Sequence, residues 1–485
     1  MLFNSIEYLL FFPLVVVAYF LIPKNSVRII LLLVASYFFY MCWNPVYALL
    51  IVFSTIADFF IGRRIHNSKD QTVRKRFLAL SLLVNLGILF YFKYYNFLAE
   101  NLQVLLDIIN PEWYIPEHNW LLPVGISFYT FQTLSYTIDI FFKKLEPEPS
   151  FMRFALFVSF FPQLVAGPIE RAANLLPQFQ RKMKVDYDRM IFGFRMILWG
   201  MFKKVVVADR LAMFVDMVYS DPLSYGGLAT LIASIFFVFQ IYCDFSGYTD
   251  IAIGSAKVLG FDLMENFRGP LLSRNMTEFW RRWHISLSTW IRDYVFGPLN
   301  MALRNIGTYS YLVVSLMSFT VFGFWHGANW TFVLWGVLHG VAIGYETLTR
   351  KKRKRLAKTT NKLLYSTCSV FLTFSFWTFT MIIFRAENIA DAFTMIGNIA
   401  NVTDRGYFEL ANFIKVKYVV LKQFYFALGL IAVMILIHFF EYKNSVYDFV
   451  GRQPLVLRWT IYLMLVLMIF NFGWAEEVPF VYFQF

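Results

Sequence analysis

Charged residues and cysteines are scarce in this sequence, and each shortage excludes a class of protein. Only 15% of its 485 residues are charged, whereas 59% are hydrophobic and 20% are aromatic. This composition and the mean hydropathy of +0.56 exclude an ordinary soluble protein. The three cysteines are scattered through apolar surroundings, so they predict neither a disulfide framework nor a metal site. They are Cys42, Cys243 and Cys368.

Motifs for several common chemistries are also missing. The sequence contains no Walker loop, no dinucleotide-binding fingerprint, no Cys/His zinc spacing and no Gly-x-Ser-x-Gly nucleophile elbow. It also lacks the alternating segments of about 9 to 11 residues that build outer-membrane barrels. We therefore expect a helical membrane protein without a bound metal.

Apolar segments recur along nearly the whole chain and predict an all-α, polytopic integral membrane protein. We expect about 11 to 12 transmembrane helices in a single membrane domain over residues 1–485, with N-terminal spans in 1–145, a catalytic core in 146–350 and C-terminal spans in 351–485. The segment Met1–Pro23 lacks a basic start and a small-residue cleavage site, so it reads as the first span. The segment 151–180 is interrupted by prolines and Gly167 and reads as re-entrant. The expected spans lie near residues 5–22, 28–43, 46–62, 77–97, 120–142, 190–216, 226–246, 309–325, 331–349, 361–384, 418–441 and 459–476.

The net charge of +13 would suit nucleic acid in a soluble protein, but here the basic residues gather between apolar segments. Such clusters set the orientation of membrane proteins, with the basic side in the cytoplasm. We therefore expect the lipid bilayer and no nucleic acid as a partner, and we place the loop at 98–119, which carries acidic residues, outside. The basic clusters are Arg63, Arg64, Lys69, Arg74, Lys75 and Arg76; Arg181, Lys182 and Lys184; and Arg350 to Arg355.

Residues 321–330 place an imidazole, His326, and an amide, Asn329, in a run that otherwise reads as membrane. Polar groups are costly there and usually have a function. A neutral imidazole costs less than a charge and can exchange a proton near neutral pH. His326 is therefore a candidate general base in a water-poor site. The structural alternative is a histidine bonded to a neighbouring helix.

A second histidine, His284, lies among arginines, tryptophans and hydroxyl groups in residues 276–293. On a single helix with about 100° per residue, one arc of roughly 80° carries five polar side chains, namely Thr277, Arg281, His284, Ser288 and Arg292. Beside them, Glu278 and Arg282 have the spacing of a local ion pair. This face predicts a site for a polyphosphate ligand, because guanidinium groups bind phosphate in bidentate geometry. The alternative is an interfacial helix whose arginines reach lipid headgroups.

The stretch from Asp244 to Asp250 holds two acids and a hydroxyl group inside an apolar region. We interpret it as a helix broken near Gly247, with its polar groups facing a cavity, and as the start of a broken polar region over 247–300. A nucleophile site is the weaker interpretation.

In combination, these stretches resemble the membrane-bound O-acyltransferases, and especially the bacterial branch that acetylates alginate and related surface polysaccharides. The resemblance covers at least residues 30 to 345. It rests on Phe279-Trp280-Arg281-Arg282-Trp283-His284-Ile285-Ser286-Leu287-Ser288, Trp325-His326-Gly327-Ala328-Asn329, and the stretches 122–131, 161–169 and 244–250. After Pro298 the chain runs Leu299-Asn300-Met301-Ala302, where that branch has a stretch like Gly-Gly-Asn-Arg, which leaves the polysaccharide open.

The resemblance implies that His326 is the essential histidine, that His284 is the second motif histidine and that cytoplasmic acetyl-CoA is the donor. The residues fit this independently, because thioester acyl transfer needs a base and a site that excludes water. We assign Arg281, Arg282, Arg292 and Ser288 to donor binding. We interpret His339 as structural.

The sequence thus predicts an enzyme of the bacterial cytoplasmic (inner) membrane that moves an acetyl group from acetyl-CoA toward a polysaccharide hydroxyl. No large domain outside the membrane is visible that would hold a polymer, so we expect a secreted or membrane-anchored acetyltransferase partner. Two alternatives stay open. One is D-alanyl transfer to teichoic acid from a carrier protein, and the other is a transporter or flippase for glycan precursors in which the histidines relay protons.

Overall fold

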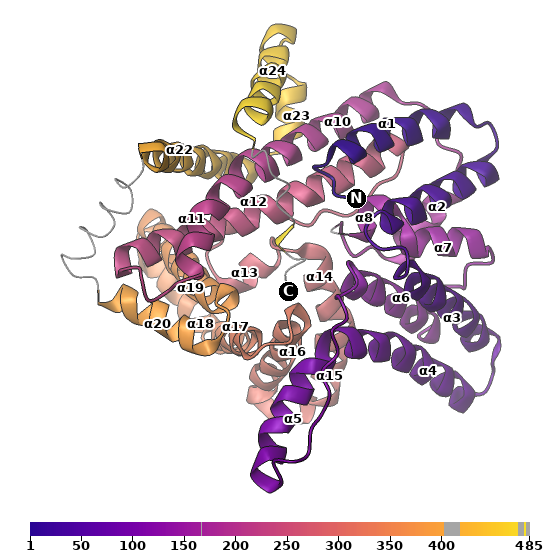
Figure 1. Cartoon of the computed structure of the whole chain (residues 1–485), viewed down its shortest axis with the longest axis horizontal. Helices are drawn as coiled ribbons and strands as arrows, with labels where there is room; N and C mark the ends of the chain where they lie inside the picture. The colour runs from indigo at the N-terminus through magenta and orange to yellow at the C-terminus, as the bar shows by residue number, and fades with distance from the viewer. Residues whose placement is uncertain (166, 402–417, 474–479, 482–485) are drawn as a thin grey trace. The chain divides into compact units, whose positions relative to one another are not determined.

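The computed structural model describes residues 1–165, 167–401, 418–473 and 480–481. All regular secondary structure within these residues is helical (Figure 1), which confirms the predicted all-α class. The chain divides into two compact units, one formed by Met1–Phe194 and Ile251–Met264 and the other by Arg195–Asp250 and Glu265–Phe485.

The first unit contains a bundle of apolar helices whose bounds, except for those of α4, lie within six residues of the predicted spans. Its centre is held by polar contacts: Asp58 on α3 accepts hydrogen bonds from Ser81 at 2.6 Å and from Asn85 at 2.7 Å, both on α4. All three side chains are buried, so the carboxylate is satisfied inside the bundle. The helices are α1 (Ile6–Leu21), α2 (Asn25–Met41), α3 (Ala48–Asn67), α4 (Gln71–Leu89) and α6 (Ile126–Phe141).

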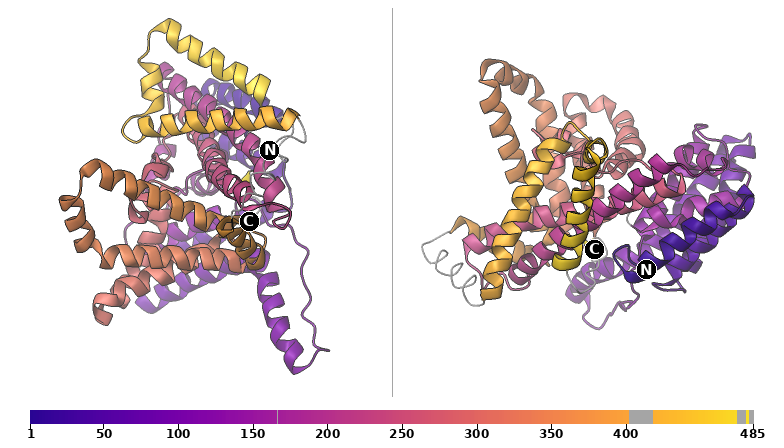
Figure 2. Two further views of the ribbon diagram at one scale, coloured as in Figure 1. Left: turned by 90° about the vertical axis from the view of Figure 1, so that its left-hand side faces the viewer. Right: turned by 90° about the horizontal axis from the view of Figure 1, so that it is seen from above.

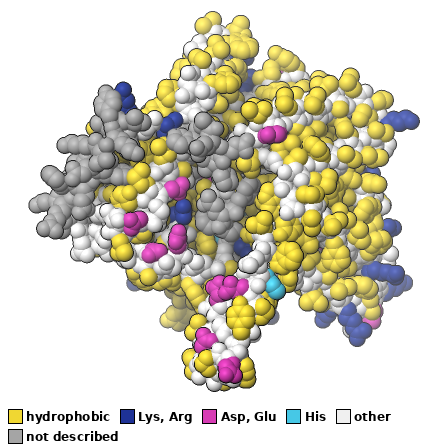
Figure 3. Space-filling view, in the orientation of Figure 1, with side chains coloured by type: hydrophobic (Ala, Val, Ile, Leu, Met, Phe, Trp, Pro, Cys, Tyr) yellow, Lys and Arg dark blue, Asp and Glu magenta, His cyan; other side chains and the backbone are white. Residues whose placement is uncertain are grey.

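The helix that begins with α4 is much longer than the predicted span at 77–97. It continues through a π-helical turn, η1 (Phe90–Tyr94), into α5 (Tyr95–Ile109), and the whole run has 39 residues. At about 1.5 Å per residue its path along the chain is about 58 Å, against about 30 Å of hydrocarbon in a bilayer, and α4 and α5 run in different directions (Figure 1). In Figure 3, acidic side chains lie among hydrophobic ones over α5. The expected loop at 98–119 is therefore helical over its first half.

The segment predicted to be re-entrant forms three short helices in the first unit. These are α7 (Phe151–Ser159), α8 (Phe161–Leu164) and α9 (Ala172–Phe179), and Ser150 caps the first by accepting a hydrogen bond from the Arg153 amide. Pro162 lies at the start of α8, where its missing N–H costs nothing. Most of α7 and α8 is buried. Ala166 lies outside the described residues.

The second unit holds both histidine motifs. It begins within α10 (Tyr187–Met201), and Figure 2 shows α22 and α24 joined by the short α23. Its further elements are η2 (Phe202–Ala208), α11 (Asp209–Tyr219), α12 (Gly227–Leu259), η3 (Pro270–Leu272), α13 (Met276–Trp280), α14 (Ile285–Ile291), η4 (Arg292–Phe296), α15 (Gly297–Ala302), η5 (Arg304–Tyr309), α16 (Ser310–His326), α17 (Trp330–Leu348), α18 (Arg350–Thr359), α19 (Lys362–Arg385), α20 (Ile389–Ala400), α22 (Tyr418–Glu441), α23 (Val446–Gly451) and α24 (Leu455–Phe472).

Six helices within the described residues are long and apolar enough to cross a membrane, and further apolar helices of 10–17 residues accompany them. Large hydrophobic side chains are exposed on many of them, and Figure 3 shows hydrophobic atoms over much of the visible face. A soluble protein rarely exposes so much apolar surface in one area. The chain is a multi-pass membrane protein. The basic residues at 350–355, expected in a loop, form the exposed helix α18.

Candidate functional site

Close packing of α16 on α17 positions the first histidine motif. A Cβ atom on Gly323 would lie 2.2 Å from the Phe332 carbonyl oxygen, and one on Gly336 would lie 2.2 Å from the Phe319 carbonyl oxygen. Only glycine permits such an approach, as in other membrane helix pairs that meet through small residues. The two backbones therefore fix the end of α16, where His326 stands.

His326 is the last residue of α16 and is 5% exposed. Four aromatic rings surround its imidazole, with centroid distances of 4.9 to 5.3 Å. They belong to Phe322, Trp325, Trp335 and Phe384. The imidazole thus lies in an apolar, buried site.

Asn329, the amide of the same motif, has a structural role in the fold. Its side-chain oxygen accepts a hydrogen bond from the Thr331 amide at 3.0 Å and so caps the N-terminus of α17. Its side-chain nitrogen donates to the Glu387 carbonyl at 2.9 Å. Asn329 therefore fixes the turn that directly follows His326.

The prediction of one helix over residues 276–293 is wrong. The segment forms α13 and α14, and the chain between them turns at His284, whose φ of 43° and ψ of 55° lie in the left-handed region. A non-glycine residue adopts this conformation only when its surroundings impose it, and such residues are frequent at functional sites. The single face proposed for Thr277, Arg281, His284, Ser288 and Arg292 consequently does not exist.

Glu346 on α17 holds the start of α13. Its carboxylate accepts hydrogen bonds from the amides of Met276 and Thr277 and from the Thr277 hydroxyl, at 2.6 to 2.9 Å. An anion at a helix N-terminus satisfies amides that lack helical partners. The N-terminus of α13 is thereby fixed to α17, the helix that follows His326.

His284 is fully buried. Its Nδ1 lies 3.4 Å from the side-chain oxygen of Asn266, which also accepts a hydrogen bond from the Ser286 amide, and the ring meets Phe245 edge-on at 4.6 Å. Burial lowers the pKa of His284 to about 3, because the charged imidazolium would be removed from water. The imidazole is therefore neutral at pH 7.

The fold brings both histidine motifs into one aromatic cluster. The ring of Trp325 lies 6.4 Å from that of His284 and 4.9 Å from that of His326. His339 belongs to the same cluster, 4.7 Å from the Trp335 ring, and its Nε2 lies 3.2 Å from the Thr380 hydroxyl. That contact suits the structural interpretation of His339.

The residues assigned to donor binding have different surroundings. Arg281 is exposed and forms no ion pair within the described part of the chain. Arg282 makes the predicted ion pair with Glu278 at 3.1 Å and also lies 4.0 Å from the Tyr442 ring. Arg292 pairs with the adjacent Asp293 at 2.8 Å. The Ser288 hydroxyl donates a hydrogen bond to the Trp283 carbonyl oxygen at 3.2 Å, just before the start of α14. Arg281 is the arginine best placed to meet a new anion.

The stretch 244–250 is not a broken helix, since α12 continues without interruption to Leu259. Its acids bind two buried lysines that the sequence reasoning missed: Lys204 lies 2.7 Å from both Asp209 and Asp244, and Lys203 lies 2.5 Å from Asp250. Paired lysines in an otherwise apolar segment were the available signal, because a buried cation needs an anionic partner. These residues form an internal charge network in the second unit.

Metal coordination receives no support from the described residues, among which no group of three or more His, Cys, Asp or Glu side chains is suited to hold an ion.

Sequence comparison connects this arrangement to known proteins. Residues 142–386 match the membrane-bound O-acyltransferase family. The chain is 39% identical over 403 residues to the probable alginate O-acetylase AlgI of Azotobacter vinelandii, which covers 81% of this chain and 77% of that protein. It is 33% identical over 430 residues to the peptidoglycan O-acetyltransferase of Helicobacter pylori, and the match covers 82% of this chain and 79% of that protein. A weaker match is to the teichoic acid D-alanyltransferase of Streptococcus thermophilus, which is 31% identical over 251 residues. That match covers 49% of this chain and 60% of that protein.

The family match includes both histidine motifs, and the similarity to the alginate O-acetylase extends over most of both chains. The protein is therefore an O-acyltransferase of the membrane-bound O-acyltransferase family, in its alginate-type O-acetyltransferase branch.

Proposed function

We propose that this membrane O-acetyltransferase takes its acetyl group from cytoplasmic acetyl-CoA and passes it across the inner membrane toward the hydroxyl groups of a surface polysaccharide. The observation that carries the proposal is the shared contact of His284 and His326 with Trp325 in a buried aromatic cluster. Two polar groups in one water-poor site suit the transfer of an acyl group from a thioester to a hydroxyl.

His326 is the proposed general base. It removes the proton of the attacking hydroxyl, whose oxygen bonds to the acetyl carbon as the C–S bond of the thioester breaks, and the proton then passes from His326 to the departing thiolate. The neutral His284 is proposed to donate or accept a hydrogen bond in the same site, since its pKa is too low for it to carry charge. Arg281 is proposed to meet a phosphate of the donor, because it is exposed and makes no ion pair with the described residues.

A partner protein is proposed as the direct acceptor, because a polymer needs an exposed cleft. Its Ser or Thr hydroxyl would receive the acetyl group and pass it to sugar. The segments near 98–119, 218–226 and 385–417 lie between predicted spans and are expected to face outward, so each is proposed to contact the partner; residues 402–417 lie outside the described residues. Trp113, Tyr114 and Trp120 are 53%, 74% and 59% exposed and would serve as aromatic anchors.

Reconstitution with isotopically labelled acetyl-CoA tests the donor and the direction. The protein is placed in liposomes, labelled acetyl-CoA is added to the face that carries α18, and polysaccharide with or without the partner is enclosed inside. We expect the label on enclosed polysaccharide only with the partner present. Acetylation of the polymer at the cellular rate without any partner would refute the relay, and no acetyl-CoA hydrolysis or exchange in any arrangement would refute the donor.

Because the chain is also similar to a D-alanyltransferase, the experiment tests a second acyl donor. A D-alanyl group on a phosphopantetheine carrier protein is supplied in place of acetyl-CoA. We expect no transfer from it. Transfer from the carrier but not from acetyl-CoA would replace acetylation by D-alanylation.

A further inference from the structure

A groove of about 730 Å³ in the second unit lies outside the histidine cluster. α19 contributes Leu363, Ser366, Thr367, Val370, Phe371 and Phe374, α22 contributes Ile431, Ile435, His438 and Phe439, and Tyr442 directly follows the end of α22. In each set the residues recur three or four apart, so each helix presents one face. Ile235 and Phe239 of α12 complete the apolar wall. The volume lies within the range of about 300 to 1,000 Å³ that is typical of ligand sites.

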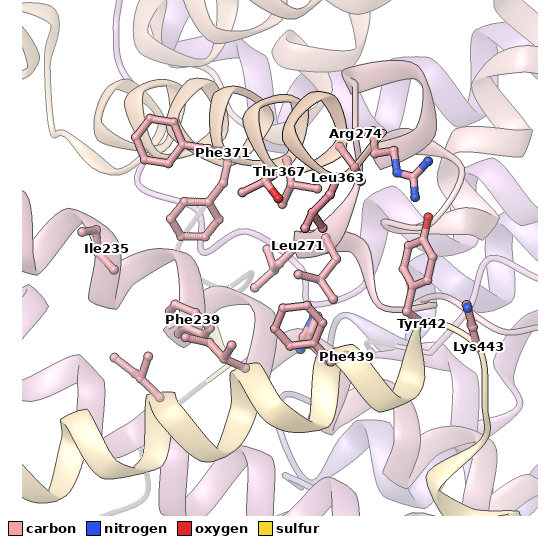
Figure 4. Close-up of a pocket in the computed structure, with 17 residues that line it drawn as sticks. Ile235, Phe239, Leu271, Arg274, Leu363, Thr367, Phe371, Phe439, Tyr442 and Lys443 are labelled. Atoms are coloured by element: carbon pink, nitrogen blue, oxygen red, sulfur yellow. The ribbon is translucent and has the colours of Figure 1, made fainter. Parts of the chain in front are cut away.

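The polar groups of this groove gather at one end. Figure 4 shows Arg274, Tyr442 and Lys443 together at that end, whereas Ile235, Phe239 and Phe371 lie toward the other. Arg274 and Lys443 are exposed, and neither forms an ion pair within the described residues. A cationic mouth on an apolar groove is complementary to an amphiphile that has an anionic head and a hydrocarbon tail.

His438 adds a polar group at a defined depth below the mouth. It is 1% exposed, its Nδ1 lies 3.3 Å from the Met434 carbonyl oxygen, and its Nε2 has no hydrogen-bond partner among the described residues. The His438 ring meets that of Tyr242 edge-on at 4.4 Å, so it marks a fixed depth in the wall of the groove. His438 precedes Tyr442 by one helical turn, or about 6 Å along the axis. Ile435 and Ile431 continue the groove inward.

The mouth lies at the cytoplasmic end of these helices. α19 begins at Lys362, directly after the basic helix α18, which the distribution of positive charge places in the cytoplasm. α22 ends at Glu441, beside Tyr442 and Lys443. The cytoplasmic leaflet carries the anionic lipids that attract such residues.

We propose that this groove is a binding site for an anionic glycerophospholipid of the cytoplasmic leaflet. The phosphate lies between Arg274 and Lys443, the glycerol backbone lies at the depth of His438, and an acyl chain extends past Ile435 and Ile431 between α19 and α22. Tyr442 also donates to Glu278 at 2.7 Å and packs on Arg282, so a bound lipid stabilises the segment that leads to Arg281 and His284. The lipid site does not depend on the identity of the acyl donor.

Native mass spectrometry of the full chain in detergent, titrated with phosphatidylglycerol, tests the site. We expect one lipid to bind more tightly than all others, and Arg274→Ala with Lys443→Ala to weaken it by about tenfold or more, because each basic residue near the surface attracts the phosphate. Ile435→Trp should also weaken it, by filling the groove while leaving the charges in place. Lys351→Ala with Lys354→Ala on α18 is the matched control and should change affinity by less than about twofold.

Three results would overturn the proposal. One is equal affinity for phosphatidylcholine and phosphatidylglycerol, which would mean that the basic residues do not favour an anionic headgroup. Another is unchanged binding in both the charge variant and Ile435→Trp at wild-type thermal stability. The third is displacement of the lipid by CoA, which would assign the groove to the acyl donor.

Discussion

A single methyl group at the α16–α17 crossing should disturb the position of His326. In Gly336→Ala the new Cβ would lie 2.2 Å from the Phe319 carbonyl oxygen, whereas such contacts normally measure about 3.3 Å. The two helices must therefore separate by about 1 Å at this point. Overpacking of this kind costs about 1 to 3 kcal/mol. A displacement of about 1 Å at a catalytic group lowers rates by about 100-fold.

The assay pairs thermal unfolding in detergent with acetyl transfer. Gly397→Ala and Gly429→Ala are matched controls, since no atom lies within 4 Å of a Cβ built at either position. Each control should leave the rate unchanged and should stabilise its helix, because alanine favours a helix by about 1 kcal/mol over glycine. Wild-type stability and a wild-type rate in Gly336→Ala would show that the crossing does not position His326.

Three further substitutions test other parts of the site. Lys204→Met should cost about 3 to 5 kcal/mol in thermal unfolding, because it leaves Asp209 and Asp244 buried without their cation; stability equal to that of the exposed Lys354→Met would contradict this. Arg281→Ala should weaken acetyl-CoA binding, measured by calorimetry, by about tenfold, as expected for the loss of a charged hydrogen bond. The control Lys351→Ala should bind acetyl-CoA as the wild type does. Equal affinity of both variants and the wild type would mean that Arg281 contacts lipid headgroups instead. Glu346→Gln should lower stability by about 1 kcal/mol or more by weakening the cap of α13, and an unchanged melting temperature would argue against that cap.

The membrane helices could be predicted from the sequence because their limits are set by local composition. The predicted span at 331–349 corresponds to α17 at Trp330–Leu348, and the span at 418–441 corresponds to α22 at Tyr418–Glu441. The prediction was wrong where distant residues decide the conformation. Residues 276–293 have helical periodicity, but the side chain of Asn266, which lies outside this segment, holds the turn at His284 by contacting His284 and the Ser286 amide.

The polar stretch at 244–250 illustrates the same limit. Gly247 and the acids beside it predicted a broken helix whose polar groups face a cavity. Lys203 and Lys204 satisfy them, so α12 continues. The pairing depends on how α12 packs against η2, which residue spacing does not specify. By contrast, the Glu278–Arg282 pair predicted from the i, i+4 spacing is confirmed, although Arg282 lies just beyond the end of α13. The catalytic roles of His326 and His284 stay predictions.

The central claim is that His326 is the base for acetyl transfer, and His339 provides an internal comparison for it. Both imidazoles are buried in the same aromatic cluster and contact Trp335, so truncation of either leaves a similar cavity. The measurement is the rate of polysaccharide acetylation by His326→Ala and His339→Ala at matched abundance and with matched melting temperatures. We predict a loss of about 100-fold or more for His326→Ala, as for removal of a general base, and less than about tenfold for His339→Ala, whose Nε2 meets Thr380. Wild-type acetylation by His326→Ala, or an equal loss in both variants, would contradict the assignment.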